Sequence, residues 1–365
     1  MIGVVEAFSQ KYSEARRKFL EATASAGLAV TSHKHPLPGI EGEDLALDVA
    51  LDGDLAAGKL LIVSSGCHGV EGYCGSGVQV FALHDAEWRE TARSQGIAVL
   101  YLHALNPYGF SFCSRTTHEN VDLNRNFSDY SQPRQPNLAY RDVHAMLVPE
   151  QWPPDPENMT QIQAYIQAKG IKGFQAAVSG GQNEYPDGLF YAGAGPTWSN
   201  LTLRSVLKHY AANVKNLAWI DLHTGLGPPG IGERIFAGPN DPVAYQRTVA
   251  WWSGGGSTPV TSTYQGTSAS ASLTGQMFYG VLEEMPQSQY TGIAMEYGTV
   301  PIMETMQALR ADQWVRRHPE APAGKAASLR RQVRDAFYTD TDLWKGQIIS
   351  QARQAMFQAA DGLAS

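Results

Sequence analysis

Four short apolar runs constrain the fold of this 365-residue chain most strongly. They cover residues 59–65, 97–102, 217–221 and 291–295. Their length and their lack of alternation are typical of strands buried on both faces, as in a parallel sheet covered by helices. Segments with helical periodicity lie between them, and this alternation predicts an α/β fold.

The remaining pattern predicts the other elements in outline. Glycine, serine and threonine dominate residues 254–276, which we interpret as a long surface loop that is either functional or flexible filler. The other expected segments are a helix at 5–25, a half-buried strand at 44–51, a helix at 74–93, a turn at 106–109, an irregular stretch at 128–156, helices at 157–169 and 197–210, and further helices over 301–362.

Charge and cysteine content exclude several classes of protein. The 28 basic and 35 acidic residues give a formal net charge of −7, without a basic patch for nucleic acid or an anionic membrane. Three cysteines do not form a disulfide framework and suit a reducing compartment. No apolar run has the length of a membrane span, and the N-terminus does not resemble a signal peptide. We therefore expect a cytoplasmic protein with neither nucleic acid nor membrane as its partner.

Polar residues follow each of the four runs. His68 and Glu71 follow the first, a turn at Asn106 follows the second, and His223 and Glu296 follow the third and fourth. In open α/β sheets, ligands bind beyond the carboxyl ends of the strands. The sequence thus predicts one site at this edge of the sheet.

Two histidines and one carboxylate at such an edge are the ligand set of an open zinc site, with one position left for water. A bare H-x-x-E is common by chance, and His223 could be a hydrogen-bonded core histidine. The glycines of segment 66–72 (GCHGVEG), which let the backbone bend around one point, favour His68 and Glu71 as ligands. A metal-dependent hydrolase follows as the main hypothesis.

A second polar cluster is the segment 120–127 (NVDLNRNF), with Arg115 a few residues before it. The planar guanidinium group of arginine binds carboxylates with two parallel hydrogen bonds, and asparagine can orient the same group. Two arginines near a metal cation would form an anion-binding pocket. The alternative is a set of surface salt bridges.

Together these motifs resemble the zinc carboxypeptidase family, that of carboxypeptidase A. The match is nearest to a bacterial branch with HGVEG and NVDLNRNF motifs, with aspartoacylase and succinylglutamate desuccinylase as more distant relatives. The resemblance implies a three-layer α/β/α fold with a mixed, largely parallel sheet. It also implies one domain over residues 1–365, with additional N-terminal (5–25) and C-terminal (301–362) helices.

By position, the resemblance also implies roles for individual residues. One zinc ion per chain would be held by His68, Glu71 and His223. Glu296 would be the general base and Arg115 would stabilise the oxyanion. Asn124 and Arg125 would bind a substrate carboxylate, and Asp122 would orient His68.

The sequence departs from the family in two respects. Arg115 lies closer to Asn124 than in the digestive carboxypeptidases, at a spacing nearer that of the acylases. No motif selects the mobile tyrosine that carboxypeptidases place over the substrate, although Tyr264 and Tyr279 are candidates. Segment 179–188 is expected to approach the site, and Cys67 is interpreted as a buried thiol and not as a nucleophile.

The resulting hypothesis is a zinc-dependent hydrolase that cleaves an amide next to a free carboxylate, with Glu296 as general base. It would be a metallocarboxypeptidase or an N-acyl amino acid deacylase, acting on a peptide or a small molecule. The alternatives are a hydrolase of non-peptide amides or esters in specialised metabolism and a catalytically silent binding protein of the same fold. The sequence does not indicate an oligomeric state.

Overall fold

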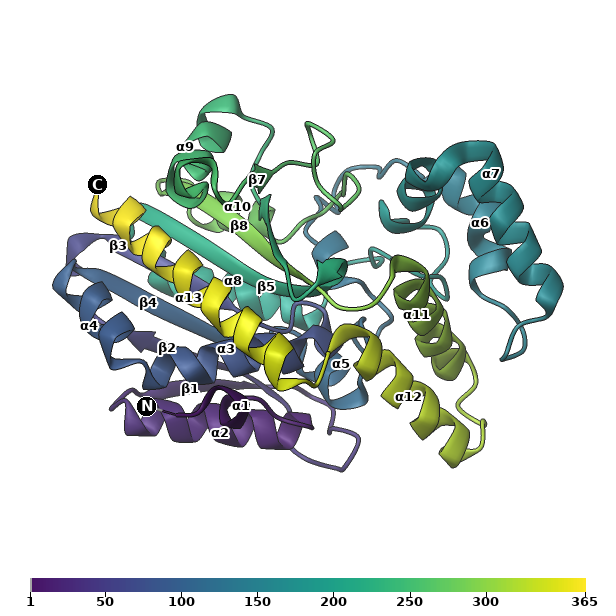
Figure 1. Cartoon of the computed structure of the whole chain (residues 1–365), viewed down its shortest axis with the longest axis horizontal. Coiled ribbons are helices and arrows are strands. Elements are labelled where there is room, and N and C mark those ends of the chain that lie inside the picture. Colours follow the sequence, from purple (N-terminus) through teal and green to yellow (C-terminus); the bar gives the residue numbers. More distant parts are fainter. Residues whose placement is uncertain (1) are drawn as a thin grey trace.

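An eight-stranded sheet forms the centre of the computed structural model, which describes residues 2–365 (Figure 1). The strands follow the order β1-β2-β4-β3-β5-β8-β6-β7. Their bounds are β1 Val30–Lys34, β2 Ala46–Asp52, β3 Lys59–Ser64, β4 Ile97–His103, β5 Asn216–Pro229, β6 Gly232–Phe236, β7 Val260–Thr261 and β8 Gln289–Gly298.

The four predicted buried strands, β4, β3, β5 and β8, lie side by side and pair in parallel. The strands outside them pair mostly antiparallel, as in β1–β2, β2–β4 and β6–β8. The sheet is therefore mixed, as predicted. Because parallel neighbours point the same way, the carboxyl ends of the four central strands meet at one edge.

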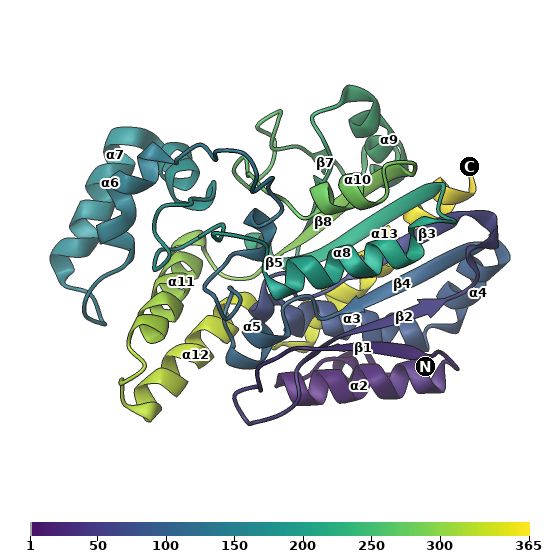
Figure 2. The same cartoon turned by 180° about the vertical axis from the view of Figure 1, so that it is seen from behind.

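Helices cover both faces of this sheet (Figures 1 and 2). The helices are α1 Val4–Ala7, α2 Tyr12–Ser25, α3 Gly72–His84, α4 Ala86–Ser94, α5 Pro107–Phe112, α6 Leu138–Leu147, α7 Pro156–Ser179, α8 Trp198–Ala211, α9 Pro242–Trp252, α10 Phe278–Glu284, α11 Ile302–Arg317, α12 Ala323–Phe337 and α13 Asp342–Ala364.

Alternation along β3 shows how the two layers are separated. Leu61 and Val63 belong to the core beneath α2, α3 and α13, whereas Leu60 and Ile62 belong to the core beneath α8 and α10. Successive side chains of a strand point to opposite faces, so one continuous apolar run supplies both cores. The α/β fold predicted from the runs and the three-layer α/β/α arrangement implied by the family resemblance are both confirmed.

Two predicted helices are interrupted. The helix expected at 5–25 is divided into α1 and α2, and the one expected at 74–93 is divided into α3 and α4. Asp85 lies at the second break, where its carboxylate accepts a hydrogen bond from the backbone N of Trp88 and caps α4. This capping interaction starts a new helix where periodicity alone predicted continuation.

Other boundaries were also predicted wrongly. The stretch 128–156 contains helix α6, which buries Tyr140, Val143 and Leu147 at helical spacing. Asn106 caps the short helix α5 and does not form an isolated turn. The helix expected at 157–169 continues to Ser179 across non-helical backbone at Gly170. Strands β1, β6 and β7 and helices α9 and α10 were not predicted.

Within residues 2–365, none of the helices combines the length and apolar composition that a membrane span requires.

Candidate metal centre

The sheet topology brings the three predicted ligands together. His68 follows β3 and immediately precedes the short 3-10 helix Gly69–Glu71, while His223 lies within β5, the parallel neighbour of β3. The backbone at Gly69 lies very close to that of α5, because a Cβ on Gly69 would lie 2.1 Å from the carbonyl carbon of Gly109. Backbone hydrogen bonds from Gly69 to Arg115 O (3.1 Å) and from Val70 to Ser114 O (2.9 Å) join this loop to the segment that carries Arg115.

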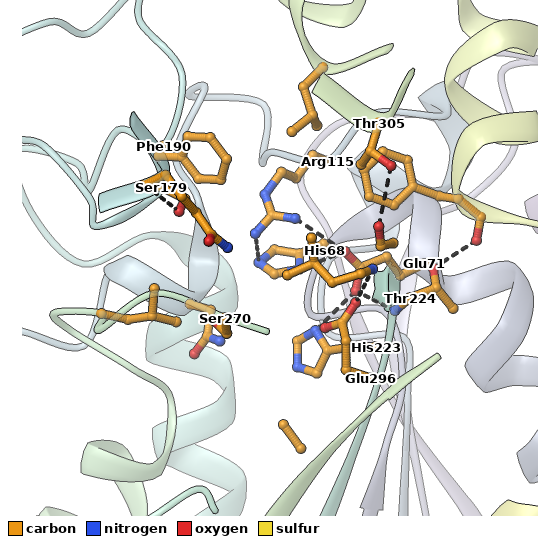
Figure 3. A pocket seen from close by; sticks show the side chains of 18 of the residues that line it. His68, Glu71, Arg115, Ser179, Phe190, His223, Thr224, Ser270, Glu296 and Thr305 are labelled. Atoms are coloured by element: carbon orange, nitrogen blue, oxygen red, sulfur yellow. Dashed lines mark hydrogen bonds and ion pairs between the residues drawn. The ribbon is translucent and has the colours of Figure 1, made fainter. Parts of the chain in front are cut away.

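Glu71 lies between the two histidines (Figure 3). Its Oε1 is 2.9 Å from Nδ1 of His68, and its Oε2 is 2.9 Å from Nδ1 of His223. One nitrogen of each ring and one carboxylate oxygen all lie within 4.8 Å of one another. Two imidazole nitrogens and a carboxylate oxygen form the donor set of an open zinc site.

The opposite nitrogen of each ring contacts a buried aspartate. Nε2 of His68 is 3.1 Å from Oδ1 of Asp122, and Nε2 of His223 is 2.5 Å from Oδ2 of Asp221. Carboxylates behind metal-bound histidines fix the ring orientation and raise ligand basicity. Asp122 thus contacts His68, for which an orienting role was predicted, and Nη2 of Arg115 lies 2.8 Å from the same ring nitrogen. Asp221 was not predicted.

A second group, Cys67 with Asp221 and His223, also brings its donor atoms within 4.8 Å of one another. However, burial raises the pKa of the Cys67 thiol well above its usual value, with Asp221 adding to the shift. Cys67 and Asp221 do not line the cavity that His68, Glu71 and His223 face. A catalytic metal needs a position open to substrate, so the predicted trio fits such an ion better.

The electrostatic environment of the predicted trio, which consists of His68, Glu71 and His223, favours positive charge. Burial alone would lower the pKa of His223, but Asp221 and Glu71 raise it well above its usual value. Burial alone would raise the pKa of Glu71, but the two histidines hold it below its usual range. A site that stabilises a proton between these carboxylates would also stabilise a divalent cation there.

Glu296 lies beside His223 across the β5–β8 pair, in direct register. Its Oε1 accepts a hydrogen bond of 3.0 Å from the backbone N of Leu226, and its side chain lines the cavity. Burial raises the pKa of Glu296 to about 8, with the charge of Glu71 contributing. His223 and Glu296 lie inside extended strands, not after strand ends as expected.

Arg115 and Arg125 both line the cavity. Arg115 donates to Asp122 Oδ2 (3.0 Å) and to Glu71 Oε1 (3.2 Å). Arg125 uses Nε and Nη2 on the backbone oxygen of Ser179, at 3.1 and 2.6 Å. Burial lowers the pKa of Arg125, although Asp122 partly offsets this. Arg125 is thus a buried cation that an anionic substrate group would stabilise.

Asn124 also lines the cavity and precedes Arg125 in the chain. Its side-chain oxygen accepts a hydrogen bond of 2.9 Å from the backbone N of Met277, which orients the amide group. The 3-10 helix Leu123–Arg125 begins at Asp122, whose carboxylate accepts from Asn124 N. The predicted site residues are therefore all gathered around one cavity or directly behind its wall.

Phe190 is a cavity residue that the sequence did not indicate. Its ring lies beneath both guanidinium groups, 5.1 Å from Arg115 and 5.7 Å from Arg125. It also has a positive φ of 55°, which is uncommon for a bulky residue. A backbone outlier at a ligand cavity is a pointer to function that only the structure provides.

The tyrosine candidates do not reach the cavity. Tyr264 donates to the backbone oxygen of Gly238 at 3.0 Å, and Tyr279 packs on Phe278 with ring centroids 4.3 Å apart. Among residues 2–365, no tyrosine lines the cavity. Of the segment 179–188, Ser179 alone contributes to the wall.

Comparisons with known proteins place the chain in a family. The family described as "Protein of unknown function (DUF2817)" matches residues 8–351. The chain is similar to the structure of thrombin activatable fibrinolysis inhibitor, with a TM-score of 0.50 and 11% identity over 96% of this chain and 74% of the other. Carboxypeptidase A from Helicoverpa armigera gives a TM-score of 0.48 and 12% identity, over 92% of this chain and 75% of the other.

No curated protein matches the sequence. At these identities the similarity concerns the fold alone. The carboxypeptidase-like α/β fold predicted from the motifs is confirmed.

Proposed function

The chain belongs to the DUF2817 family, and from this premise we propose that it is a zinc-dependent hydrolase that cleaves an amide next to a free carboxylate. The observation that carries the proposal is the donor trio His68, Glu71 and His223, whose atoms lie within 4.8 Å of one another at the wall of a cavity. That cavity has a free volume of about 120 Å³.

In this proposal the trio holds one zinc ion per chain. When bound, zinc polarises the scissile carbonyl and lowers the pKa of a coordinated water to about 7. Asp221 accepts the Nε2 proton of His223, which leaves the Nδ1 lone pair of that ring free to bind the ion. Nε2 of His68 lies 3.1 Å from Asp122 and 2.8 Å from Nη2 of Arg115, and Nδ1 of His68 faces Glu71.

Glu296 acts as the general base. Its raised pKa suits a group that accepts a proton from the attacking water and passes it to the leaving nitrogen. The hydrogen bond from Leu226 N to Glu296 Oε1 leaves the other carboxylate oxygen available for this transfer. Proton transfer of this kind typically contributes ~10²–10⁴-fold to the rate.

The arginines have separate roles. Arg115, which contacts Glu71, is close enough to the trio to stabilise negative charge that develops on the carbonyl oxygen. Arg125 and Asn124, which also line the cavity, bind the substrate carboxylate. The substrate class is a peptide or an N-acyl amino acid, since both present an amide beside a carboxylate.

A substrate panel with the zinc-loaded protein tests this function. We expect hydrolysis of N-acyl amino acids or peptides, loss of activity with a chelator, and recovery with zinc. Esters with the same acyl groups, and amides that lack the carboxylate, test the alternative, a hydrolase of non-peptide amides or esters. Turnover by a metal-free preparation, or equal turnover without the carboxylate, would contradict the proposal.

A further inference from the structure

The cavity has two ends with different chemistry. One end, on the left of Figure 3, is marked by Ser179 and Ser270, and Arg125 donates to the backbone of Ser179 there. The other end, on the right, is marked by Thr224 and Thr305. His68 lies between these two groups of residues in this view, and Thr224 adjoins the trio, since its backbone N donates to Oε2 of Glu71 at 3.2 Å. If the carboxylate of the substrate is held at the Arg125 end, the acyl part extends to the Thr305 end.

The acyl end is apolar. Helix α11 contributes Ile302, Met306 and Leu309 to the wall, and Leu226 and Phe337 complete it. Leu309 and Phe337 are buried, Met306 and Leu226 are partly exposed, and Ile302 is exposed. These five side chains offer no hydrogen-bond donor, and their only polar atom is the weakly accepting thioether sulfur of Met306.

The hydroxyl groups at this end are already used within the protein. Thr224 donates to the backbone oxygen of Phe337 at 2.7 Å, and Thr305 donates to the backbone oxygen of Gly225 at 3.2 Å. Each hydroxyl has a single proton, so neither can donate to a substrate without giving up its internal partner. A polar group on the substrate would therefore lose its hydration here without compensation.

Charge is confined to the reaction centre and the Arg125 end. Among residues 2–365, the titratable side chains that line the cavity are six. They are His68, Glu71, Arg115, Arg125, His223 and Glu296. None belongs to α11 or to the segment around Phe337, so a charged acyl chain at this end would have no counter-ion.

On this basis, and resting on the proposed function, we propose that the substrate is an N-acyl amino acid whose acyl group is an uncharged aliphatic chain, bound against Leu226, Met306, Leu309 and Phe337. The site then recognises a molecule with one anionic end and one apolar end. Dicarboxylic acyl groups and acyl groups with a free amine are excluded.

Three substrates that differ only in the terminal group of the acyl chain test this inference. They are the N-hexanoyl, N-adipoyl and N-(5-aminopentanoyl) derivatives of one amino acid, which share four methylenes and end in methyl, carboxylate and ammonium. We expect kcat/KM of the zinc-loaded protein to be about 100-fold higher for hexanoyl than for either charged derivative. Across acetyl, butanoyl and hexanoyl, kcat/KM should rise about 4-fold per methylene. Charged derivatives within about 3-fold of hexanoyl would overturn the inference.

Met306→Lys is the informative variant, with Met306→Leu as its volume-matched control. The lysine should lower kcat/KM for hexanoyl and raise it for adipoyl, each by about 10-fold, because it supplies the missing counter-ion. Met306→Leu should retain the order of substrates that the unaltered protein shows, with hexanoyl above adipoyl. An unchanged order of substrates in folded Met306→Lys would contradict the placement of the acyl group.

Binding to zinc-loaded Glu296→Gln, measured by calorimetry, separates this inference from the proposed function. Tighter binding of hexanoyl than adipoyl, with no hydrolysis by the unaltered protein, would overturn the function and retain the apolar pocket. Hydrolysis without acyl preference, together with equal binding, would retain the function and overturn the pocket.

Discussion

Asp221 and His223 lie two residues apart on the same face of β5, with Oδ2 of the aspartate 2.5 Å from Nε2 of the histidine. The other oxygen of Asp221 accepts from Ser64 on β3, which in turn accepts from the indole nitrogen of Trp219. This buried chain of hydrogen bonds fixes the ring of a proposed metal ligand from behind.

Asp221→Asn should therefore weaken zinc binding about 10–100-fold, because an amide oxygen is a weaker acceptor for the histidine proton. Competition with a chromogenic chelator measures the affinity. Asp122→Asn should have a similar effect through His68, and the exposed Asp129→Asn serves as control. Unchanged affinity in Asp221→Asn would remove it from the metal centre.

Asp312 on α11 should position Arg115 without touching the substrate. Its Oδ2 accepts from the Ser114 hydroxyl at 2.7 Å and from Arg115 N at 3.1 Å. Asp312→Ala should lower kcat/KM by about 10-fold or more, since small misplacements of a catalytic group are costly. Zinc content should stay constant, and Asp312→Asn, which retains an acceptor, should recover part of the loss. Equal loss in both variants would contradict a positioning role.

Phe190→Leu should affect both stability and substrate binding. The ring interacts with two like-charged guanidinium groups, and each cation–π contact contributes about 0.5–1 kcal/mol. We expect the free energy of unfolding to fall by about 1–2 kcal/mol, as measured by urea denaturation. KM should rise while kcat changes less, because Arg125 is loosened. An unaltered KM would contradict a role for the ring at the carboxylate end.

His103 should make the folded protein sensitive to acid. It is fully buried, stacks on Phe19 with ring centroids 4.5 Å apart, and contacts Ser76. Burial lowers the pKa of His103 to about 4, against about 6.5 in an unfolded chain. Between these values the unfolded state binds more protons than the folded state, so stability falls as the pH falls.

The decrease in the free energy of unfolding that is due to His103 should reach about 3 kcal/mol between pH 6.5 and pH 4. Urea denaturation of the unaltered protein and of His103→Gln at several pH values measures it. The difference between their pH slopes isolates His103 from the other histidines. Identical slopes would show that His103 is not held neutral in the fold.

The sequence was most informative where local pattern and global fold agree. The runs at 59–65 and 217–221 form neighbouring parallel strands, and this topology brings His68 and His223 together from 155 positions apart. Asp221 could also have been predicted, because residues two apart on a strand share a face.

Other parts of the site depend on contacts that no local pattern encodes. Asp312 contacts Arg115 across 197 positions of the chain. Phe190 reaches both arginines from a backbone conformation that bulky residues rarely adopt. Helix α6 was not predicted, because the helix is short and prolines and polar residues surround it, so the helical spacing of its buried residues did not stand out. These features are decided by tertiary packing and become visible only in the folded chain.

The metal content of the purified protein tests the account most directly, measured beside His68→Ala, His223→Ala and the exposed-histidine control His209→Ala. We expect about one zinc per chain in the unaltered protein and in the control, and loss of zinc in the two ligand variants. Absence of zinc after incubation with the ion, or equal zinc in all four proteins, would contradict a metal centre at His68, Glu71 and His223.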